Sequence, residues 1–436
     1  MTASGMTEAA GVAPPRHRPG ALGDWRREAA LWLRSTSAVA SVALLAALAT
    51  VAVALGLGEV ARQHAAIERV LDLQASEEAA IAGFAEDAGS AAYSTAHATW
   101  DSPSPLAFAA LGQRDAAPWV LRVRALALEG QLYESDAQNP ELALPGHFDL
   151  AFVLVYLAPL VLVALLHDLK SAEREAGRLG LLLSMPGATR RLWVARAGVR
   201  AIAVLLALAV PFGFGAALAG AGLLETLGGL GVMVGTVAFW TLLAVLIALR
   251  GRRSAVNAAI LCAAWFALVL VGPAAGHLAV NAAVPIPSGA ELARENREAV
   301  HGAWDRPRAE TMARFVSSHP EWAPYAAIDR PFHWKWYFAF QQLGDEHVAE
   351  RSRAYRDGIE RRERLAGAIG WVLPPIGLQR ALHRLARTDV AAQLEYQERI
   401  RAFHAELRAF YWPYVFREQP FGPADFARTP RFASVR

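Results

Sequence analysis

Charged side chains crowd into one short segment, residues 168–191, which lies between two long apolar stretches. Lys170 and Glu173 are three residues apart, as are Glu175 and Arg178, so opposite charges can pair on one face of a helix. Such a segment offers ion pairs and hydrogen bonds to a partner surface. It contains neither a nucleophile beside a base nor a set of metal ligands.

Small and turn-forming residues shape the same segment. Gly177 and Gly180 allow a bend or a close backbone approach, and Pro186 followed by Gly187 is typical of a turn. Thr189 can cap the helix that follows. The pattern predicts a short helix, a sharp elbow and a return to the next apolar stretch. From the residues alone, an ordinary solvated loop explains the charges equally well.

Signals for catalysis are weak elsewhere in the chain. There is no G-x-S-x-G elbow, no H-E-x-x-H pair and no G-x-x-x-x-G-K-[ST] phosphate loop. His333, His347 and His404 have no metal-ligand spacing. The neighbouring His167 and Asp168 suit the start of an interfacial loop as well as acid–base work. We therefore expect no catalytic, cofactor-binding or metal site in this chain.

Five apolar stretches of the chain are close to, or longer than, the roughly 20 residues needed to span a hydrocarbon layer. Hydrophobic residues make up 54% of the chain and charged residues 19%, whereas soluble domains average roughly 25% charged. The sequence predicts an all-α polytopic membrane protein with five transmembrane helices, or six if a further span completes it. The stretches are residues 37–57, 150–166, 201–224, 227–249 and 255–280.

Basic residues predict the orientation, because they favour the cytoplasmic side of short loops. Arginines precede the first span, several basic residues lie in 168–193, and three arginines lie in 250–253. The turn 222–229 between spans three and four has Glu225 and no basic residue. The N-terminus and the segment 168–193 are therefore predicted to be cytoplasmic. No concentrated basic face indicates nucleic-acid binding.

The predicted organisation alternates membrane and outer regions. A cytoplasmic tail over 1–30, expected to be disordered until an interfacial helix near Trp25, precedes the first span at 31–57. Residues 58–147 are predicted to form a first extracytoplasmic domain, opened by a helical stalk over 59–86 that the prolines of 101–105 interrupt. The second span covers 148–167, the coupling helix and elbow 168–193, and spans three to five 194–281.

Residues 282–436 are predicted to form a second, mostly helical extracytoplasmic domain. Charged helices are expected over 345–365 and 390–411, on either side of an apolar element at 366–378. That element is too short to span and is broken by Pro374-Pro375, so we expect it to be interfacial or re-entrant. The single cysteine, Cys262, excludes a disulfide within one copy. Two sizeable outer regions without disulfides favour the inner (plasma) membrane of a bacterium.

An aromatic run over 333–340 is the other conspicuous pattern. Trp334, Trp336, Phe338 and Phe340 alternate with other residues, which fits a strand. Trp and Tyr suit a membrane interface equally. Packing or interfacial anchoring is the preferred interpretation, with ligand stacking as the alternative.

The segment from Glu173 to Pro186, with its Glu, Gly, Leu-rich run and Ser-x-Pro, resembles a motif that follows the second span of ABC-2 type transporter permeases. The architecture is similar to a subgroup with large extracytoplasmic insertions after spans one and five. Residues 373–379, 382–385, 388–389 and 430–432 resemble that subgroup's second insertion. Such permeases usually have six spans, and the sixth would follow about where this chain stops.

The resemblance implies transport driven by a separate ABC ATPase subunit, which would hold the ATP and Mg²⁺. It also implies that residues 168–191 dock in a groove on that ATPase. Glu173, Glu175, Gly177 and Arg178 match the motif and are the predicted contact residues. The chain would work with a second copy or with a sister permease.

No recognisable motif in the sequence identifies the transported substrate. Charged residues are absent from the centres of spans three to five, which argues against an ion or proton relay there. This favours a bulky lipid-like or peptide-like substrate. The alternative function is a non-transport membrane sensor or assembly factor whose outer domains bind a partner. A membrane-bound hydrolase or transferase ranks last.

Overall fold

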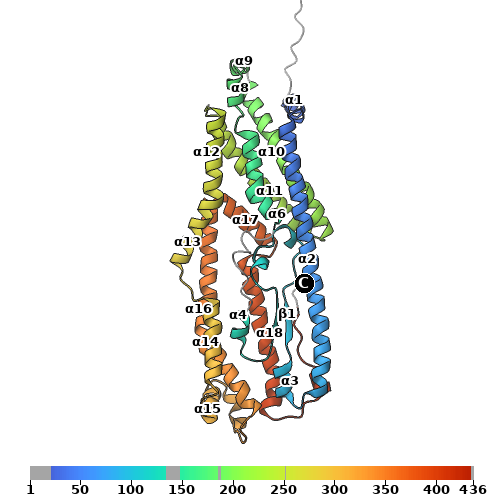
Figure 1. Cartoon of the computed structure of the whole chain (residues 1–436), viewed down its shortest axis with the longest axis vertical. Helices are drawn as coiled ribbons and strands as arrows, with labels where there is room; N and C mark the ends of the chain where they lie inside the picture. Colours follow the sequence, from blue (N-terminus) through green and yellow to red (C-terminus); the bar gives the residue numbers. More distant parts are fainter. Residues whose placement is uncertain (1–20, 134–147, 185–187, 251, 434–436) are drawn as a thin grey trace, which may run out of the picture.

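The protein is an elongated, mainly helical body with the segment α8–α9 at one end and α15 at the other (Figure 1). The computed structural model describes residues 21–133, 148–184, 188–250 and 252–433. The elements up to residue 184 are α1 (Ala21–Leu33), α2 (Thr36–Phe84), α3 (Ala88–Ser94), β1 (His97–Trp100), η1 (Ala107–Ala109), η2 (Gly112–Asp115), β2 (Val120–Val123), α4 (Leu128–Tyr133), α6 (Leu150–Phe152), the π-helix η3 (Val153–Leu157), α7 (Ala158–Leu166), α8 (Ser171–Glu175) and α9 (Leu179–Leu183).

Helices also make up the regular elements of the remaining described residues. They are α10 (Ala188–Leu218), α11 (Leu223–Ala248), α12 (Ser254–Phe266), the π-helix η4 (Ala267–Val271), α13 (Gly272–Ala283), α14 (Gly289–Gly302), α15 (Arg308–Ser318), η5 (Pro320–Tyr325), α16 (Trp334–Val372), α17 (Pro374–Leu385), α18 (Val390–Phe416) and α19 (Pro423–Phe426). The predicted predominance of helix is confirmed. The described exception is one antiparallel pair, in which His97 faces Val123 and Trp100 faces Val120.

Five helical segments in the described part are long and apolar enough to cross a membrane, as predicted. They are Thr36–Phe84, Leu150–Glu175, Arg190–Leu218, Leu223–Ala248 and Ser254–Ala283. The third ends six residues before the predicted boundary at 224. Gly220 has a φ of +70°, a left-handed conformation that ends helices, and the next helix has already begun at Leu223.

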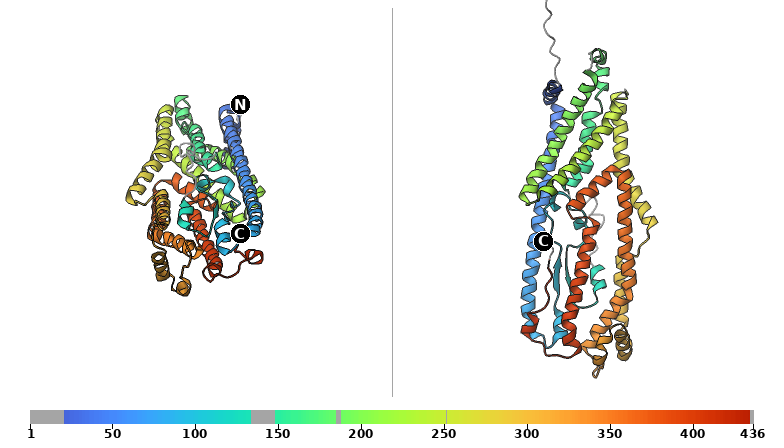
Figure 2. Two further views of the ribbon diagram at one scale, coloured as in Figure 1. Left: turned by 60° about the horizontal axis from the view of Figure 1, so that its bottom comes forward. Right: turned by 180° about the vertical axis from the view of Figure 1, so that it is seen from behind.

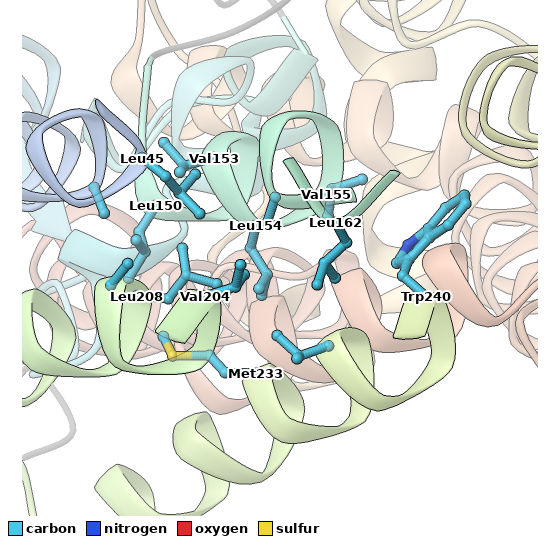
Figure 3. Packing of buried hydrophobic residues seen from close by; sticks show 14 of the residues in the cluster. Leu45, Leu150, Val153, Leu154, Val155, Leu162, Val204, Leu208, Met233 and Trp240 are labelled. Carbon is cyan, nitrogen blue, oxygen red and sulfur yellow. The ribbon is translucent and has the colours of Figure 1, made fainter. Parts of the chain in front are cut away.

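The other four segments pack around α7 and its preceding π-helix. In Figure 3, Leu154 and Leu162 of this central segment face the helices that carry Val204 (α10) and Met233 and Trp240 (α11). These five side chains are almost completely buried. Of the most apolar 18 residues in each segment, 61% are buried in Leu150–Glu175 and 17% in Ser254–Ala283. The second span, which was the shortest in sequence, is therefore the core of the bundle.

Helix α2 continues far beyond the bundle along one side of the molecule (Figure 2). The helical pattern read over 59–86 is thus present as a continuation of the first apolar segment. The helix ends at Phe84, well before the prolines of 101–105 that were expected to interrupt the stalk. The reason is local: the Asp87 side chain accepts a 2.7 Å hydrogen bond from the backbone N–H of Ser90 and so begins α3.

The two predicted outer regions, 58–147 and 282–436, share one hydrophobic cluster and so form one body among their described residues. We call it the distal body. It consists of the end of α2 together with α3, β1, β2, α4, α14, α15, η5, α16, α18 and α19. Buried residues from the earlier region pack with buried residues from the later one. Examples are Ile81, Val123, Leu128, Trp336, Tyr396 and Leu407.

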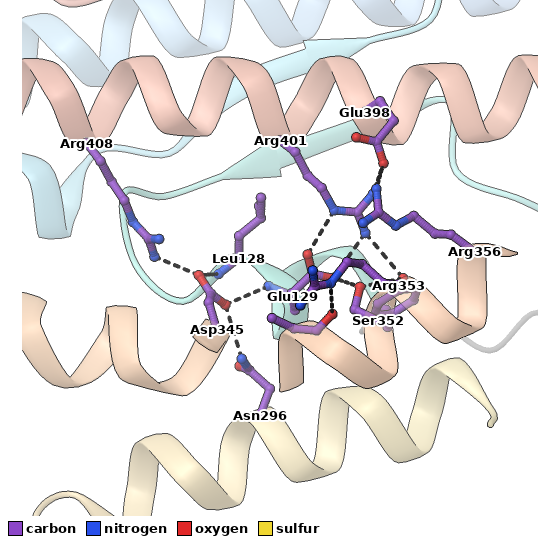
Figure 4. Close-up of polar contacts among 12 residues, drawn as sticks. Leu128, Glu129, Asn296, Asp345, Ser352, Arg353, Arg356, Glu398, Arg401 and Arg408 are labelled. Atoms are coloured by element: carbon purple, nitrogen blue, oxygen red, sulfur yellow. Dashed lines mark hydrogen bonds and ion pairs between the residues drawn. The ribbon is translucent and has the colours of Figure 1, made fainter. Parts of the chain in front are cut away.

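Buried ion pairs join the same two regions (Figure 4). Glu129 of α4 accepts hydrogen bonds from Arg401 of α18 at 2.8 Å and from the Ser352 hydroxyl of α16 at 2.7 Å. Asp345 of α16 accepts from the backbone N–H groups of Leu128 and Glu129 at 2.9 and 3.0 Å, which caps α4. These contacts fix α4 between α16 and α18.

The aromatic run over 333–340 is not a strand. It begins α16, and the His333 Nδ1 accepts from the Lys335 N–H at the helix N-terminus. Trp336, Phe338 and Phe340 are all buried, because other helices surround this end of α16. Aromatic residues at every second position therefore reflect burial on several faces of this helix and not a strand. Of the two preferred interpretations, packing or interfacial anchoring, the contacts show packing.

The apolar element at 366–378 forms a corner between α16 and α17. Leu373 precedes a proline and has φ −114° and ψ 86°, outside the helical region, as expected for that position. The two prolines occupy the first turn of α17, where their missing N–H groups cost nothing. Helix α17 then packs against α11 at the junction of the bundle and the distal body.

Burial of His97 predicts that acid destabilises the distal body. Its ring is buried near Phe403 and Tyr411, and neither ring nitrogen has a hydrogen-bond partner among the described residues. Burial, with a smaller contribution from the charge of Arg122, lowers the pKa of His97 from 6.5 to about 4. The unfolded chain therefore takes up a proton at a pH where the folded chain does not. Stability is full above pH 6.5 and falls by about 3 kcal/mol toward pH 4.

Melting followed by tryptophan fluorescence between pH 7.5 and 4.5 tests this expectation. His97→Leu should reduce the loss of stability at low pH. Part of that loss should remain, because burial also lowers the pKa of His404. His347→Leu, at an exposed site on α16, is the matched control and should leave the loss unchanged. An equal acid loss in His97→Leu and the unmodified chain would contradict the assignment.

Candidate functional site

The charged segment between spans two and three folds as two short helices joined at a glycine. Helix α8 ends with a hydrogen bond from the Arg178 N–H to the Glu173 carbonyl at 2.8 Å and from the Gly177 N–H to the Arg174 carbonyl at 3.0 Å. This is the Schellman pattern, which needs a left-handed residue after the helix. Gly177 supplies it, with a φ of +73°. We call α8 and α9 together the hairpin, and it lies at the extreme end of the molecule (Figures 1 and 2).

Glu173 connects the hairpin to two other helices. One carboxylate oxygen accepts from Arg196 of α10 at 2.9 Å, and the other accepts from Arg178 at 2.8 Å. Arg196 also pairs with Glu28 of α1 at 3.0 Å. The side chains of Glu173 and Arg196 are only 12% and 13% exposed, so water screens this pair less than a surface pair. Helices α1, α8 and α10 are thus linked through one guanidinium group.

Glu175 connects the hairpin to the fifth span. Its carboxylate accepts from the Ser254 N–H at 2.8 Å and from the Ser254 hydroxyl at 3.0 Å, at the first turn of α12. The Ser254 hydroxyl also lies 2.8 Å from the Ser171 hydroxyl of α8. A carboxylate at a helix N-terminus satisfies unpaired N–H groups and interacts favourably with the helix dipole. The N-terminus of α12 is therefore capped by the hairpin.

The outer face of the hairpin is apolar. Leu181 and Leu183 are 69% and 56% exposed, and no residue of α9 is buried. The Arg178 side chain is 61% exposed beside them. Helix α9 extends past the ends of α1 and α12 (Figure 1). Exposed apolar residues beside charged ones occur at sites that contact another protein or a membrane surface.

All four predicted contact residues lie in the hairpin, but they are placed differently. Glu173 and Glu175 bind other helices of the chain, Gly177 makes the bend, and Arg178 pairs with Glu173 while its side chain stays mostly exposed. Sequence analysis did not identify Glu28, Arg196 or Ser254 as partners, because these pairs join residues far apart in the chain. The ATPase contact itself stays a prediction. The turn at 185–187 lies outside the described residues.

The described residues contain no group of three or more His, Cys, Asp or Glu side chains that could hold a metal ion. His167, considered for acid–base work together with Asp168, has its ring nitrogen against the backbone of its own helix. The His167 Nδ1 lies 3.0 Å from the Ala164 carbonyl, as is usual for a histidine at a helix end.

Comparison with known proteins gives one family match. The family described as "Domain of unknown function (DUF3526)" matches residues 290–434. The match covers α14 to α19 and leaves the five apolar segments and the hairpin outside. No curated protein matches the chain.

Residues 388–389 and 430–432, which resemble the second insertion of a permease subgroup, lie inside the matched region. Thr388 donates to the Ala110 carbonyl at 2.8 Å, and Phe432 packs edge-on against Trp100. Asp389 caps α18 by accepting from the Ala392 N–H. These residues therefore attach the matched region to the first outer region.

Proposed function

We propose that this chain is the membrane-spanning subunit of an ABC transporter of the ABC-2 type. A separate ABC ATPase would hold ATP and Mg²⁺ and would bind the hairpin from the cytoplasm. Its conformational change would move the hairpin and, through it, the membrane helices. The cargo we propose is lipid-like or peptide-like, and the membrane is the inner membrane of a bacterium.

The observation that carries this proposal is the pair of carboxylates in the hairpin. Glu173 joins the hairpin to α10 and α1, and Glu175 joins it to α12. A force on α9 therefore acts on the cytoplasmic ends of the third and fifth spans at once. An ordinary solvated loop needs no such attachments.

The distribution of basic residues supports a cytoplasmic hairpin. Arg26 and Arg27 lie in α1, Arg174 in α8, Arg190 in the first turn of α10 and Arg252 just before α12. All of these elements reach the same end of the molecule in Figure 1. Lys and Arg flanking apolar helices favour the cytoplasm, so this end is assigned inward and the distal body outward.

Charge reversal of both carboxylates tests the linkage. In Glu173→Lys with Glu175→Lys, Arg196 would face a like charge and α12 would lose its cap. We expect the ATP hydrolysis rate of the co-purified ATPase to lose its dependence on the permease, falling roughly ten-fold toward the rate of the free ATPase. The measurement is ATPase turnover in proteoliposomes, together with the amount of ATPase retained on a tagged permease.

The matched control is Glu298→Lys on α14, where the glutamate pairs with Arg294 and both side chains are 62% exposed. It reverses one carboxylate in the distal body, half of the charge change in the double variant, and should leave turnover and retention unchanged. Unchanged turnover and retention in the hairpin variant would refute the docking role of these residues.

A further inference from the structure

The corner between α16 and α17, residues 370–377, reaches into the side of the helical bundle (Figure 1). Leu373, which separates the two helices, lies against Gly272 at the start of α13. Leu378 of α17 lies against Gly235 of α11. A Cβ atom on either glycine would come to 3.0 Å from the leucine side chain. The corner therefore packs closely against both the fourth and the fifth apolar segments.

Both arms of the corner follow these two segments toward the distal body. Ile369 of α16 lies against Gly276 of α13, and Leu385 of α17 lies against Gly228 of α11. On each arm, the residue farther from the corner meets a glycine nearer the distal-body end of the segment. The corner is thus the deepest point of the pair of helices within the bundle.

The helical rise gives the depth of the corner. Gly272 lies eleven residues before Ala283, where α13 ends, and Gly235 lies twelve residues after Leu223, where α11 begins. At 1.5 Å per residue, the corner lies about 16–18 Å inside these ends. The two segments, with 26 and 30 residues, extend somewhat beyond a hydrocarbon layer of roughly 30 Å. In a bilayer that they cross, the corner therefore lies on the order of 10 Å below the hydrocarbon surface.

The backbone of the corner suits a surrounding without water. The Leu373 N–H donates to the Ile369 carbonyl at 2.8 Å. The Ile376 and Gly377 N–H groups donate to the Leu373 carbonyl at 3.0 and 3.2 Å. The two residues between them are prolines, which have no N–H group. Every backbone donor over 373–377 is thus paired or absent, which hydrocarbon requires because it offers no acceptor.

The side chains of the corner also lack charge. Arg364 and Arg380 are the nearest charged residues on the two arms. They lie roughly 14 and 11 Å from Leu373 along their helices. With the corner about 10 Å below the hydrocarbon surface, the first charges of both arms reach the polar boundary of the bilayer.

Trp371 and Val372, at the tip of the corner, have little cover within the described chain. Trp371 is 88% exposed, the highest value among the large apolar side chains of the described residues, and Val372 is 78% exposed. Val271, which precedes Gly272 in the fifth segment, is 48% exposed. The exposed apolar surface of that segment thus continues onto the corner. Contact with water would be unfavourable for this surface, whereas lipid acyl chains would cover both parts of it.

We propose that the corner between α16 and α17 enters the bilayer leaflet nearer the distal body, where Trp371 and Val372 contact lipid acyl chains. The sequence allowed an interfacial or a re-entrant position, and the contacts with Gly235 and Gly272 favour the re-entrant one. The distal body is then anchored by an element that enters the membrane without crossing it. The proposal requires that the five apolar segments cross a membrane, and it is independent of the transport function proposed above.

Fluorescence quenching of a probe on the corner tests this proposal. In the full-length chain with Cys262→Ser, Val372→Cys is labelled with an NBD maleimide and reconstituted into phosphatidylcholine vesicles. We expect lipids with a doxyl group midway along the acyl chain to quench the probe strongly. Iodide on both sides of the bilayer should have little effect. Because the Val372 side chain is exposed, its substitution should leave the fold intact.

Glu298→Cys, at a 62% exposed site on α14, is the matched control. Its probe should be quenched by iodide and not by doxyl lipid. Doxyl quenching at Val372→Cys no greater than at Glu298→Cys would overturn the proposal. Iodide quenching at Val372→Cys would then place the corner in water, and quenching by neither reagent would mean that a second copy of the chain covers it.

A second labelled position measures the depth of insertion. Leu365→Cys lies eight residues before Leu373 on α16, about 12 Å nearer the distal body. Its probe should respond more to a doxyl group near the headgroup than to one midway along the acyl chain, and the Val372→Cys probe should show the reverse. The same preference at both positions would contradict insertion of the tip.

Discussion

Arg401→Met is expected to lower the unfolding free energy of the distal body by about 3–5 kcal/mol, the cost of leaving a buried charge without its partner. Arg401 and Glu129 are 14% and 11% exposed and lie 2.8 Å apart. Burial alone would raise the pKa of Glu129, but the hydrogen bonds and charge of Arg401, with the Ser352 hydroxyl, outweigh it and lower that pKa. The Glu129 carboxylate is therefore ionised in the unmodified chain, and Arg401→Met would leave it buried without its partner. Denaturant unfolding followed by tryptophan fluorescence measures the loss.

The double variant Glu129→Met with Arg401→Met is the informative companion. Replacing both members of a buried pair with apolar residues is often close to neutral, so we expect most of the lost stability to return. Arg294→Met, at an exposed pair on α14, should cost less than about 1 kcal/mol. If Arg401→Met were no more damaging than Arg294→Met, this pair would not hold α4 in place.

Leu181→Asp with Leu183→Asp is expected to abolish retention of the ATPase on the tagged permease. Both leucines are more than half exposed and belong to a helix with no buried residue. Replacing them therefore costs the isolated chain little stability, whereas two carboxylates covered by an apolar partner surface would be buried without partners, which costs several kcal/mol. The amount of ATPase recovered from a co-expressing strain measures the effect.

A paired substitution on another exposed apolar site controls for a general loss of solubility. Leu223 and Leu224 are 74% and 83% exposed at the opposite end of the third and fourth spans. Leu223→Asp with Leu224→Asp should leave ATPase retention unchanged. Full retention by the Leu181 and Leu183 variant would mean that the ATPase binds elsewhere.

Much of the helical framework follows from local patterns in the sequence. The five apolar stretches, the helical pattern over 59–86 and the charged helices within α16 and α18 are confirmed, because long periodic segments specify their own helices. The start of α16 was misread as a strand because neighbouring helices bury it on several faces. Helix α1 begins at Ala21, inside the tail expected to be disordered, where it packs against α10.

Long-range pairing could not be predicted in the same way. Ser352 and Glu129 are separated by 223 positions along the chain, and nothing local to either residue indicates the other. The fusion of two outer regions into one body rests on such contacts. The charge pattern drew attention to the hairpin and the family resemblance supplied its contact residues, but neither revealed that Glu173 and Glu175 bind within the chain. The exposure of Leu181 could not be predicted either, since a leucine-rich run equally predicts burial.

Cross-linking of the hairpin tip to the ATPase tests the central claim most directly. The natural cysteine is removed as Cys262→Ser, and Leu183→Cys places one thiol on the exposed face of α9. With a short thiol-to-amine cross-linker in membranes from a strain that co-expresses the proposed ABC ATPase subunit, the account predicts a permease–ATPase adduct whose yield changes with ATP. The account would be contradicted if no adduct formed while a membrane-impermeant thiol reagent labelled Leu183→Cys from outside intact cells.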